Sequence, residues 1–393
     1  MTRPFPRPLL IKGARVFGPD DQGRKDCLLV AGRIAALERD IVAAHDAEIF
    51  DAAGDYLLPG FIDNHLHTLG GGGEAGPATR GPRLSASQLI ACGITCGVGL
   101  LGVDGVSRRL EDLYAHTLGL REDGMAAYML TGSYDVPPPT LTGSVQRDLF
   151  LVEPVIGVGE IAIGDHRGAF PSPRELARLG AEAMSGGRVV GKRGYVNLHV
   201  GDVPGAALPM LAAMLRESGL PADRFLATHI QRSLRLCEEA LELAQLGAFI
   251  DLTTAVTPEE GFAKALRIVD AVDALMKGGV SPARITVSSD GGGMTAIRDA
   301  RGQLVENRQC LPSGLLRDFR TLAGGRLGIA TAAAFFTANV ADVLGFERRR
   351  GRIEAGLDAD LLVLGSDLGL RAVIAGGAWW APDHGAGVAR RRE

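Results

Sequence analysis

The sequence lacks the features of a nucleic-acid-binding protein. Aromatic residues make up only 5% of its 393 residues, which argues against the stacking platforms of single-strand binders. The 46 acidic residues outnumber the 42 basic residues, so the net charge is −4 and there is no basic footprint. We therefore expect no nucleic-acid partner.

Long hydrophobic runs and paired cysteines are also missing. No apolar run reaches the ~18 residues that a membrane helix needs. Prolines interrupt the first residues, where a signal peptide needs its apolar segment. The five cysteines, an odd number, form no C-x-x-C pair; they are Cys27, Cys92, Cys96, Cys237 and Cys310. These absences predict a cytoplasmic protein with reduced thiols and no membrane partner.

The remaining composition is that of a globular protein, with 46% apolar and 22% charged residues. The length fits two or three domains of ~150 residues, or one barrel of ~250 residues with a smaller domain. Both ends of the chain consist of short β-like runs, such as LLIKGARVF near the start and RAVIAGGAWW near the end. We predict that residues 1–57 and 346–393 together form a small β-sandwich domain.

Between these ends, continuous apolar runs alternate with helical patterns. Such runs are typical of parallel strands that are buried on both faces. There are eight: LPGFIDNHLH, GITCGVGLL, AYMLTG, VIGVGEIAIG, YVNLHVG, FLATHI, AFIDLTT and ITVSSD. The helical patterns include SRRLEDLYAHTLGLRED, SPRELARLGAEAM, SLRLCEEALELAQLG and PEEGFAKALRIVDAVDALM. This alternation predicts an α/β fold, a (β/α)8 TIM barrel over residues 58–345.

Residues that bind metals lie at or near the carboxyl ends of these runs, where a barrel has the mouth of its active site. They are His65, His67, Glu160, His199, His229 and Asp290. The spacing of His65 and His67 puts both imidazoles on one face of a strand. A lone H-x-H would equally fit two structural histidines, but half of the chain's eight histidines lie at these ends.

Imidazoles with carboxylates suit Zn²⁺, and Mn²⁺ or Fe²⁺ tolerate the same ligands. Six ligands are too many for one tetrahedral site but enough for two ions, if a carboxylate bridges them. Such a pair would hold a hydroxide between the ions and polarise a carbonyl. Asp290 would bind one ion and also carry the proton. From the residues alone, Glu160 could bridge two ions or bind one.

The order of these motifs resembles the amidohydrolase superfamily. Further motifs resemble the isoaspartyl (β-aspartyl) dipeptidase family over nearly the whole chain. They are GGGGEAGPATR, GLLGVDG, TGSYDVP, TGSV, VIGVGEIAIGDHR, HVGD, THIQR and SSDG. The resemblance implies a homo-oligomeric, metal-dependent dipeptidase that cleaves the amide bond of small β-aspartyl dipeptides.

The resemblance also implies how the ligands divide. His65 and His67 would bind one ion with Asp290, and His199 and His229 would bind the other. Where the family has a carboxylated lysine that bridges both ions, this chain has Glu160. The arm of glutamate is shorter, so the metals or the strand must adjust. Lys192 is close in sequence but precedes the fifth strand, and we expect it to be a loop or surface residue.

Substrate contacts carry over in the same way. Glu74 matches the residue that receives the free α-amino group, and Tyr134 matches the tyrosine that supports the scissile carbonyl oxygen. Arg167 and Arg232 match the arginines that bind the substrate's carboxylates, which suit guanidinium forks. His166 and Asp165, which flank Arg167, receive no role.

Two departures concern the substrate pocket. Val103 replaces a family threonine, and Met294 replaces a family serine. Each replacement removes a hydrogen-bond donor worth about 0.5–1.5 kcal/mol. The fit to β-aspartate is therefore altered, and another small amide, such as a different dipeptide or an N-acyl-amino acid, is the alternative substrate. A catalytically silent scaffold is a further alternative, but such a paralogue should have lost ligands that are present here.

Overall fold

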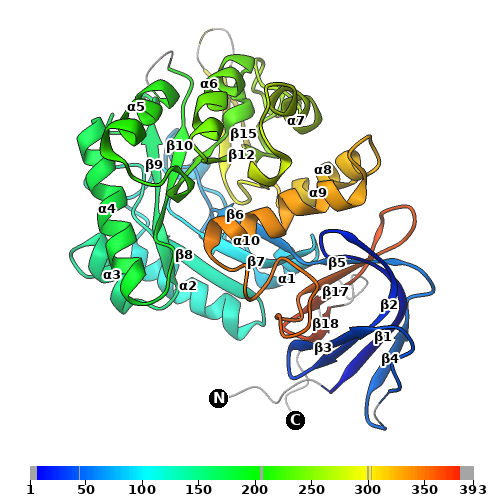
Figure 1. Ribbon diagram of the computed structural model, residues 1–393. Coiled ribbons are helices and arrows are strands. Elements are labelled where there is room, and N and C mark those ends of the chain that lie inside the picture. The colour runs from blue at the N-terminus through cyan, green and yellow to red at the C-terminus, as the bar shows by residue number, and fades with distance from the viewer. Residues whose placement is uncertain (1–6, 44, 204–206, 299–300, 302, 381–393) are drawn as a thin grey trace.

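Figure 1 shows the computed structural model, which describes residues 7–43, 45–203, 207–298, 301 and 303–380. The fold consists of a barrel wrapped by helices and a smaller domain beside it that is built on a second β-sheet. The predicted fold class is thereby confirmed.

The barrel contains eight parallel strands within the described residues, and each pairs with the next along the chain. They are β6 (Phe61–Leu66), β7 (Ile94–Gly99), β8 (Ala126–Thr131), β9 (Val155–Ile163), β10 (Tyr195–Val200), β11 (Phe225–Thr228), β12 (Phe249–Thr253) and β13 (Ile285–Ser288). All eight predicted runs form strands. β13 meets β6 through a parallel bridge between Leu66 and Gly291. Asp63 reinforces this seam, because its carboxylate accepts hydrogen bonds from the backbone and hydroxyl of Ser289.

Helices surround the strands of the barrel (Figure 1). They are α1 (Ala86–Ile90), α2 (Leu110–Glu122), α3 (Val145–Leu151), α4 (Pro173–Val189), α5 (Leu208–Ser218), α6 (Leu234–Gln245), α7 (Ile268–Lys277), α8 (Gly314–Ala323), α9 (Gly328–Phe336) and α10 (Ala338–Leu344). Helix α4 begins with a capping box, in which Ser172 and Glu175 satisfy each other's backbone N–H groups. Of the helices described, none combines the length and apolarity that crossing a bilayer would require.

One predicted helix is wrong over its first half. The pattern that starts at Pro258 becomes an α-helix only at Ile268. Thr257 caps a short 3-10 turn, and Gly261 then adopts a left-handed conformation with φ +96°. The helix cannot continue through that conformation, so the segment before α7 is a loop.

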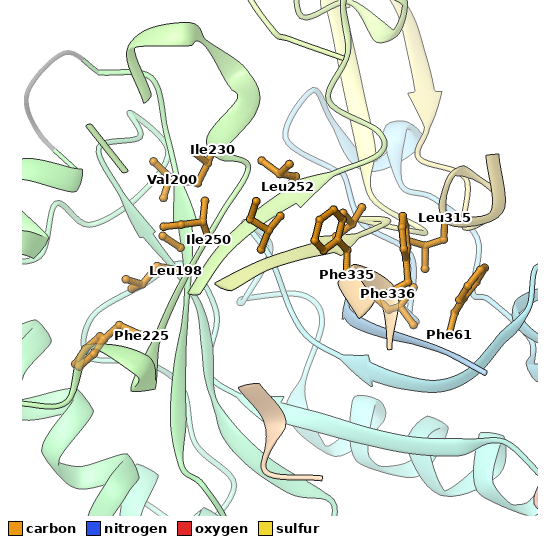
Figure 2. Close-up of a cluster of buried hydrophobic side chains, with 14 of the residues drawn as sticks. Phe61, Leu198, Val200, Phe225, Ile230, Ile250, Leu252, Leu315, Phe335 and Phe336 are labelled. Atoms are coloured by element: carbon orange, nitrogen blue, oxygen red, sulfur yellow. The ribbon is translucent and has the colours of Figure 1, made fainter. Parts of the chain in front are cut away.

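Alternation along each strand decides which side chains face the interior. Figure 2 shows Leu198 and Val200 of β10 in the buried cluster of hydrophobic side chains that also includes Phe225 of β11 and Ile230. Ile250 and Leu252 of β12 lie in the same cluster. Successive side chains of a strand point to opposite faces. The polar residues between these apolar ones, His199 among them, therefore face the inside of the barrel.

Both ends of the chain build the smaller sheet, as predicted. Its strands are β1 (Leu9–Phe17), β2 (Asp21–Val30), β3 (Arg33–Glu38), β4 (Glu48–Asp51), β5 (Tyr56–Pro59), β16 (Leu361–Leu364), β17 (Leu370–Ala375) and β18 (Ala378–Trp380). β16 pairs antiparallel with β5 and joins the two ends. Only Gly60 separates β5 from β6, so the chain passes there from one sheet to the other. The division at residues 57 and 346 stays a prediction, and residues 381–393 lie outside the described part.

A hairpin that the sequence analysis did not identify follows β13. Its strands are β14 (Met294–Arg298) and β15 (Leu304–Gln309), which pair antiparallel. Met294, Thr295 and Ala296 of this hairpin line the cavity at the mouth of the barrel. The hairpin therefore extends the wall of the candidate site.

Candidate active site

The carboxylate of Glu160 lies at the centre of four imidazoles. Its Oε2 atom is 3.0 Å from Nε2 of His65, 2.9 Å from Nδ1 of His199 and 3.4 Å from Nε2 of His229. Its Oε1 atom is 3.6 Å from Nε2 of His67. All five residues are buried, although they come from four different strands or strand ends.

These side chains form two groups that could each hold a metal ion. One group is His65, His67 and Glu160, and the other is Glu160, His199 and His229; the ligand atoms within each lie within 4.8 Å of one another. Asp290 lies next to the first group, with its Oδ1 atom 3.0 Å from Nε2 of His67. The structure thus brings together all six side chains that the sequence singled out.

A β-bulge in β9 aims Glu160 into the centre. Val158 pairs with Val196 and Ile161 pairs with Leu198, so two residues of β9 face the single residue Asn197. Such a bulge bends the strand and redirects a side chain. A Cβ atom at Gly159, the other bulged residue, would lie 2.7 Å from the carbonyl oxygen of Asn197, so this close approach requires glycine. The bulge thus directs the carboxylate of Glu160 toward the four imidazoles.

The electrostatics of the centre suit a cation. Burial opposes ionisation of Glu160, but His65 and His199 outweigh it and hold the pKa of this carboxyl well below its ordinary value. Asp290 behaves likewise, because burial is outweighed by the close approach of His67 and its pKa falls to about 2. Both nitrogens of His65, Oε1 of Glu160 and Oδ1 of Asp290 are buried without a hydrogen-bond partner among the described residues. Ionised carboxylates and unpartnered imidazole nitrogens are the donor set of divalent metals.

The hydroxyl of Tyr134 lies 2.8 Å from Nδ1 of His199, at the edge of this centre. Burial and the nearby Glu160 raise the pKa of Tyr134 well above its ordinary value. The phenol therefore keeps its proton and can act as a hydrogen-bond donor. The ring also lies beneath Arg167, whose Cζ atom is 5.6 Å from its centroid.

The charged residues expected to contact substrate surround a cavity of about 600 Å³ at the mouth. Nη1 of Arg167 lies 3.0 Å from a carboxylate oxygen of Glu74. Arg232 also lines the cavity, with its guanidinium 5.5 Å from the ring centroid of Phe262. The loop before α7, which the sequence predicted as helix, supplies Phe262 and its neighbours to the wall.

Val103 and Met294 both line this cavity. Met294 also packs beneath the glycine-rich loop: a Cβ atom at Gly72 would lie 2.7 Å from its Cγ atom, and one at Gly81 would lie 2.9 Å from its sulfur. Arg108 holds the same loop by donating hydrogen bonds to the carbonyl oxygens of Gly71 and Gly72. The loop that carries Glu74 is thus fixed from two sides.

Lys192 has its hydrogen bonds outside the cluster of histidines and carboxylates. Its ammonium donates hydrogen bonds to the carbonyl oxygens of Leu149 and Val152, at the end of α3. It lies in the turn before β10, as predicted, but it is half-buried and caps a helix rather than standing free on the surface.

The sequence analysis missed a role for Asp165. This residue is only 4% exposed and contacts both Arg167 and His199. Its position directly before His166 and Arg167, at the carboxyl end of a barrel strand, was the available signal. Asp251 was missed as well, although a carboxylate inside the apolar run AFIDLTT is costly to bury without partners.

Comparisons with known proteins agree with this geometry. The crystal structure of a β-aspartyl dipeptidase from Fervidobacterium islandicum AW-1, in complex with β-Asp-Leu, is 37% identical to this chain. The match covers 95% of this chain and 96% of that one, with a TM-score of 0.86. An enamidase of the amidohydrolase superfamily is 19% identical over 95% of both chains, with a TM-score of 0.63, which shows a shared fold.

Curated relatives match a much shorter segment. The dihydroorotase of Geotalea daltonii is 46% identical over 61 residues, which span 15% of this chain and 14% of that protein. The dihydropyrimidinase of Rattus norvegicus is 43% identical over 63 residues, 12% of its length. No family model matches the chain.

Proposed function

The chain belongs to the β-aspartyl dipeptidase family of metal-dependent amidohydrolases, and we propose that it hydrolyses the amide bond of small β-aspartyl dipeptides. The observation that carries this proposal is the pairing of Glu74 with Arg167 across the cavity beside the four histidines. A β-aspartyl residue presents a free α-ammonium next to a free α-carboxylate. The acid and the guanidinium are complementary to these two charges.

We propose that the centre holds two divalent ions, and that these are Zn²⁺, which imidazole and carboxylate ligands suit. His65, His67 and Asp290 would bind one ion, His199 and His229 the other, and Glu160 would bridge them. The proximity of Glu160 to all four imidazoles supports this division. Ions bound there supply Lewis acidity toward a carbonyl oxygen and make water acidic enough to be a nucleophile near neutral pH.

The protein's own side chains then orient the substrate and move the proton. Glu74 receives the α-ammonium, and Arg167 and Arg232 bind carboxylates. Tyr134, which stays protonated, donates a hydrogen bond toward the oxygen of the scissile carbonyl, where negative charge develops. Asp290, held ionised, accepts a proton at its carboxylate and delivers it to the leaving amine. The cavity of about 600 Å³ is large enough for a dipeptide.

The test is hydrolysis of β-Asp-Leu by the Zn²⁺-saturated protein, with α-Asp-Leu and a Glu74→Gln variant as comparisons. We expect kcat/KM for β-Asp-Leu of at least ~10⁴ M⁻¹s⁻¹, as for ordinary enzymes on their own substrates. Glu74→Gln should raise KM, and α-Asp-Leu should be a poor substrate. Absence of turnover with metal bound would refute the substrate assignment.

A second candidate substrate class is supported by the apolar side chains of Val103 and Met294 in the cavity wall. A dipeptide with another N-terminal residue, or an N-acyl-amino acid, would need fewer hydrogen bonds from these positions. Faster hydrolysis of such an amide than of β-Asp-Leu would favour this class.

A further inference from the structure

Asp165 stands at the junction between the metal centre and the substrate cavity. It lies just beyond the carboxyl end of β9, two residues after Ile163, and only 4% of its side chain is exposed. Its Oδ1 atom accepts hydrogen bonds from the backbone N–H and from Nε of Arg167, each 2.9 Å away. Its Oδ2 atom accepts another from Nη2 of Arg167 at 2.8 Å. Two parallel bonds to one guanidinium fix its plane as well as its position.

These hydrogen bonds determine which nitrogen of Arg167 faces the cavity. Nε and Nη2 are occupied by Asp165, whereas Nη1 reaches Glu74 Oε2 at 3.0 Å. The side chain of Arg167 is long and would otherwise lose rotamer entropy on binding substrate. Because Asp165 orders it in advance, less of that cost falls on substrate binding.

The same oxygen of Asp165 contacts a candidate metal ligand. Oδ2 lies 3.1 Å from Nε2 of His199, and Nδ1 on the other side of that ring lies 2.9 Å from Glu160. A neutral imidazole has one N–H and one lone pair. When Nε2–H donates to Asp165, the lone pair of Nδ1 faces the centre. Carboxylates that accept from the outer nitrogen of a histidine fix its tautomer in this way and raise its strength as a ligand.

The hydroxyl of Tyr134 agrees with this assignment. The hydroxyl of Tyr134 lies 2.8 Å from Nδ1 of His199, and a protonated phenol donates to a lone pair, not to an N–H. Two guanidinium groups lie on the outer side of the ring: Nη2 of Arg167 is 3.2 Å and Nη2 of Arg232 is 3.3 Å from Nε2 of His199, and Nη1 of Arg232 is 4.0 Å from Asp165. Because these nitrogens only donate, Asp165 is the acceptor that they share with Nε2–H. The two positive charges favour an ionised Asp165.

We propose that Asp165 is a positioning residue that serves both halves of the reaction: it orients His199 for the second metal ion and Arg167 for the substrate carboxylate. The inference rests on the proposed function, with its two-ion centre for the metal half and its dipeptide substrate for the other half. Metal affinity and substrate affinity both depend on this one buried carboxylate, so a single substitution weakens both.

The test uses the full-length protein with Asp165→Asn, which preserves shape and removes the charge. Co²⁺ binding, followed by its visible absorption, reports the affinity of each ion without any turnover. We expect the second ion to bind roughly 10–100-fold more weakly, and KM for β-Asp-Leu at saturating metal to rise at least tenfold. Asp135→Asn, which removes an exposed aspartate on the same face of the barrel, should leave both unchanged.

Arg167→Met separates the two roles. This variant leaves Asp165 and His199 in place, so KM should rise while the affinity of the second Co²⁺ stays within threefold of wild type. Wild-type metal affinity in Asp165→Asn would overturn the proposal, and so would an unchanged KM. If Asp165→Asn does not fold, loss of the second ion's affinity in Arg167→Met would overturn it instead. If wild type hydrolyses no β-aspartyl dipeptide, the proposed function fails, but the Co²⁺ titration still decides the metal half.

Discussion

The Oδ1 atom of Asp290 lies 3.0 Å from Nε2 of His67, while the Asp290 backbone occupies the left-handed region with φ +56°. A non-glycine residue in that region costs about 1–3 kcal/mol and persists only when its surroundings hold it. Here the N–H of Gly293 donates to the carbonyl oxygen of Asp290, and Cys310 pairs with the backbone of Gly292 and Gly293. The position of this carboxylate is therefore set by the backbone rather than by a mobile side chain.

Asp290→Asn should abolish turnover of β-Asp-Leu while part of the metal binding survives. The amide keeps the shape of the carboxylate but cannot accept and return a proton, so kcat should fall roughly 10²–10⁴-fold. Metal content by mass spectrometry and kcat at saturating substrate provide the check. A variant that turns over within tenfold of wild type would remove Asp290 from the mechanism.

Glu160→Gln should lower the bound metal from two ions toward one or none. The amide is neutral and adds two N–H donors among four imidazoles, where the carboxylate now offers two acceptors. Glu160→Lys extends the test, because a lysine needs carbon dioxide to become an acid at this position. Recovery of metal and activity only with added bicarbonate would identify the position as the bridge; full metal binding by Glu160→Gln would show that it is not.

Metal binding should release a proton near neutral pH. In the metal-free protein, burial lowers the pKa of His65, but Glu160 and Asp290 outweigh it and raise that pKa to about 9. His65 therefore carries its proton at pH 7 and must lose it to become a ligand. Calorimetric titration with Zn²⁺ in buffers of different ionisation enthalpy should show release of about one proton at pH 7 and less above pH 9, as the sign of the shift requires. Equal release at both pH values would contradict this.

The sequence predicted the barrel because periodicity and strand-end histidines are local signals. Leu198 and Val200 around His199, for example, already encode which side chains face inward. The bulge at Gly159 and Glu160 was not predicted, because an extra residue in one strand becomes visible only against its neighbour β10.

In the loop before α7, by contrast, the local sequence pattern gave a wrong prediction. Its residues have a helical pattern, yet Gly261 ends that continuity and Phe262 enters the cavity wall. Asp165 was visible in the sequence but had no distinguishing pattern, since its role depends on His199, 34 residues away. Local preferences fail here where the chain is shaped to line a site.

Met294→Ala should raise KM for β-Asp-Leu several-fold with a smaller effect on kcat. The methionine fills the space beneath Gly72 and Gly81, so its truncation loosens the loop that carries Glu74. Met276→Ala, near the end of α7 and outside the cavity, is the matched control. Steady-state kinetics of both variants provide the comparison. An unchanged KM in Met294→Ala would mean that Arg108 alone is enough to hold the loop.

Asp251→Ala should destabilise the protein far more than an ordinary surface substitution. Within the barrel, the Asp251 carboxylate accepts hydrogen bonds from four side chains: Thr228 at 2.7 Å, Thr286 at 2.5 Å, Ser288 at 2.6 Å and Asn64 at 3.2 Å. Alanine leaves these buried donors without their acceptor, and each unsatisfied group costs about 1–3 kcal/mol. We expect a loss of about 3–5 kcal/mol in the free energy of unfolding, at the upper end for single substitutions.

The same substitution should also weaken the second metal site, because Thr228 contacts Thr253, whose hydroxyl lies 2.8 Å from Nδ1 of His229. Urea unfolding and Co²⁺ titration measure the two effects separately. Asp273→Ala, which removes an exposed ion pair with Arg326, should cost no more than about 1 kcal/mol. If Asp251→Ala behaves like this control, then Asp251 does not organise the barrel interior, because buried hydroxyls would have found other acceptors within β12 and β13.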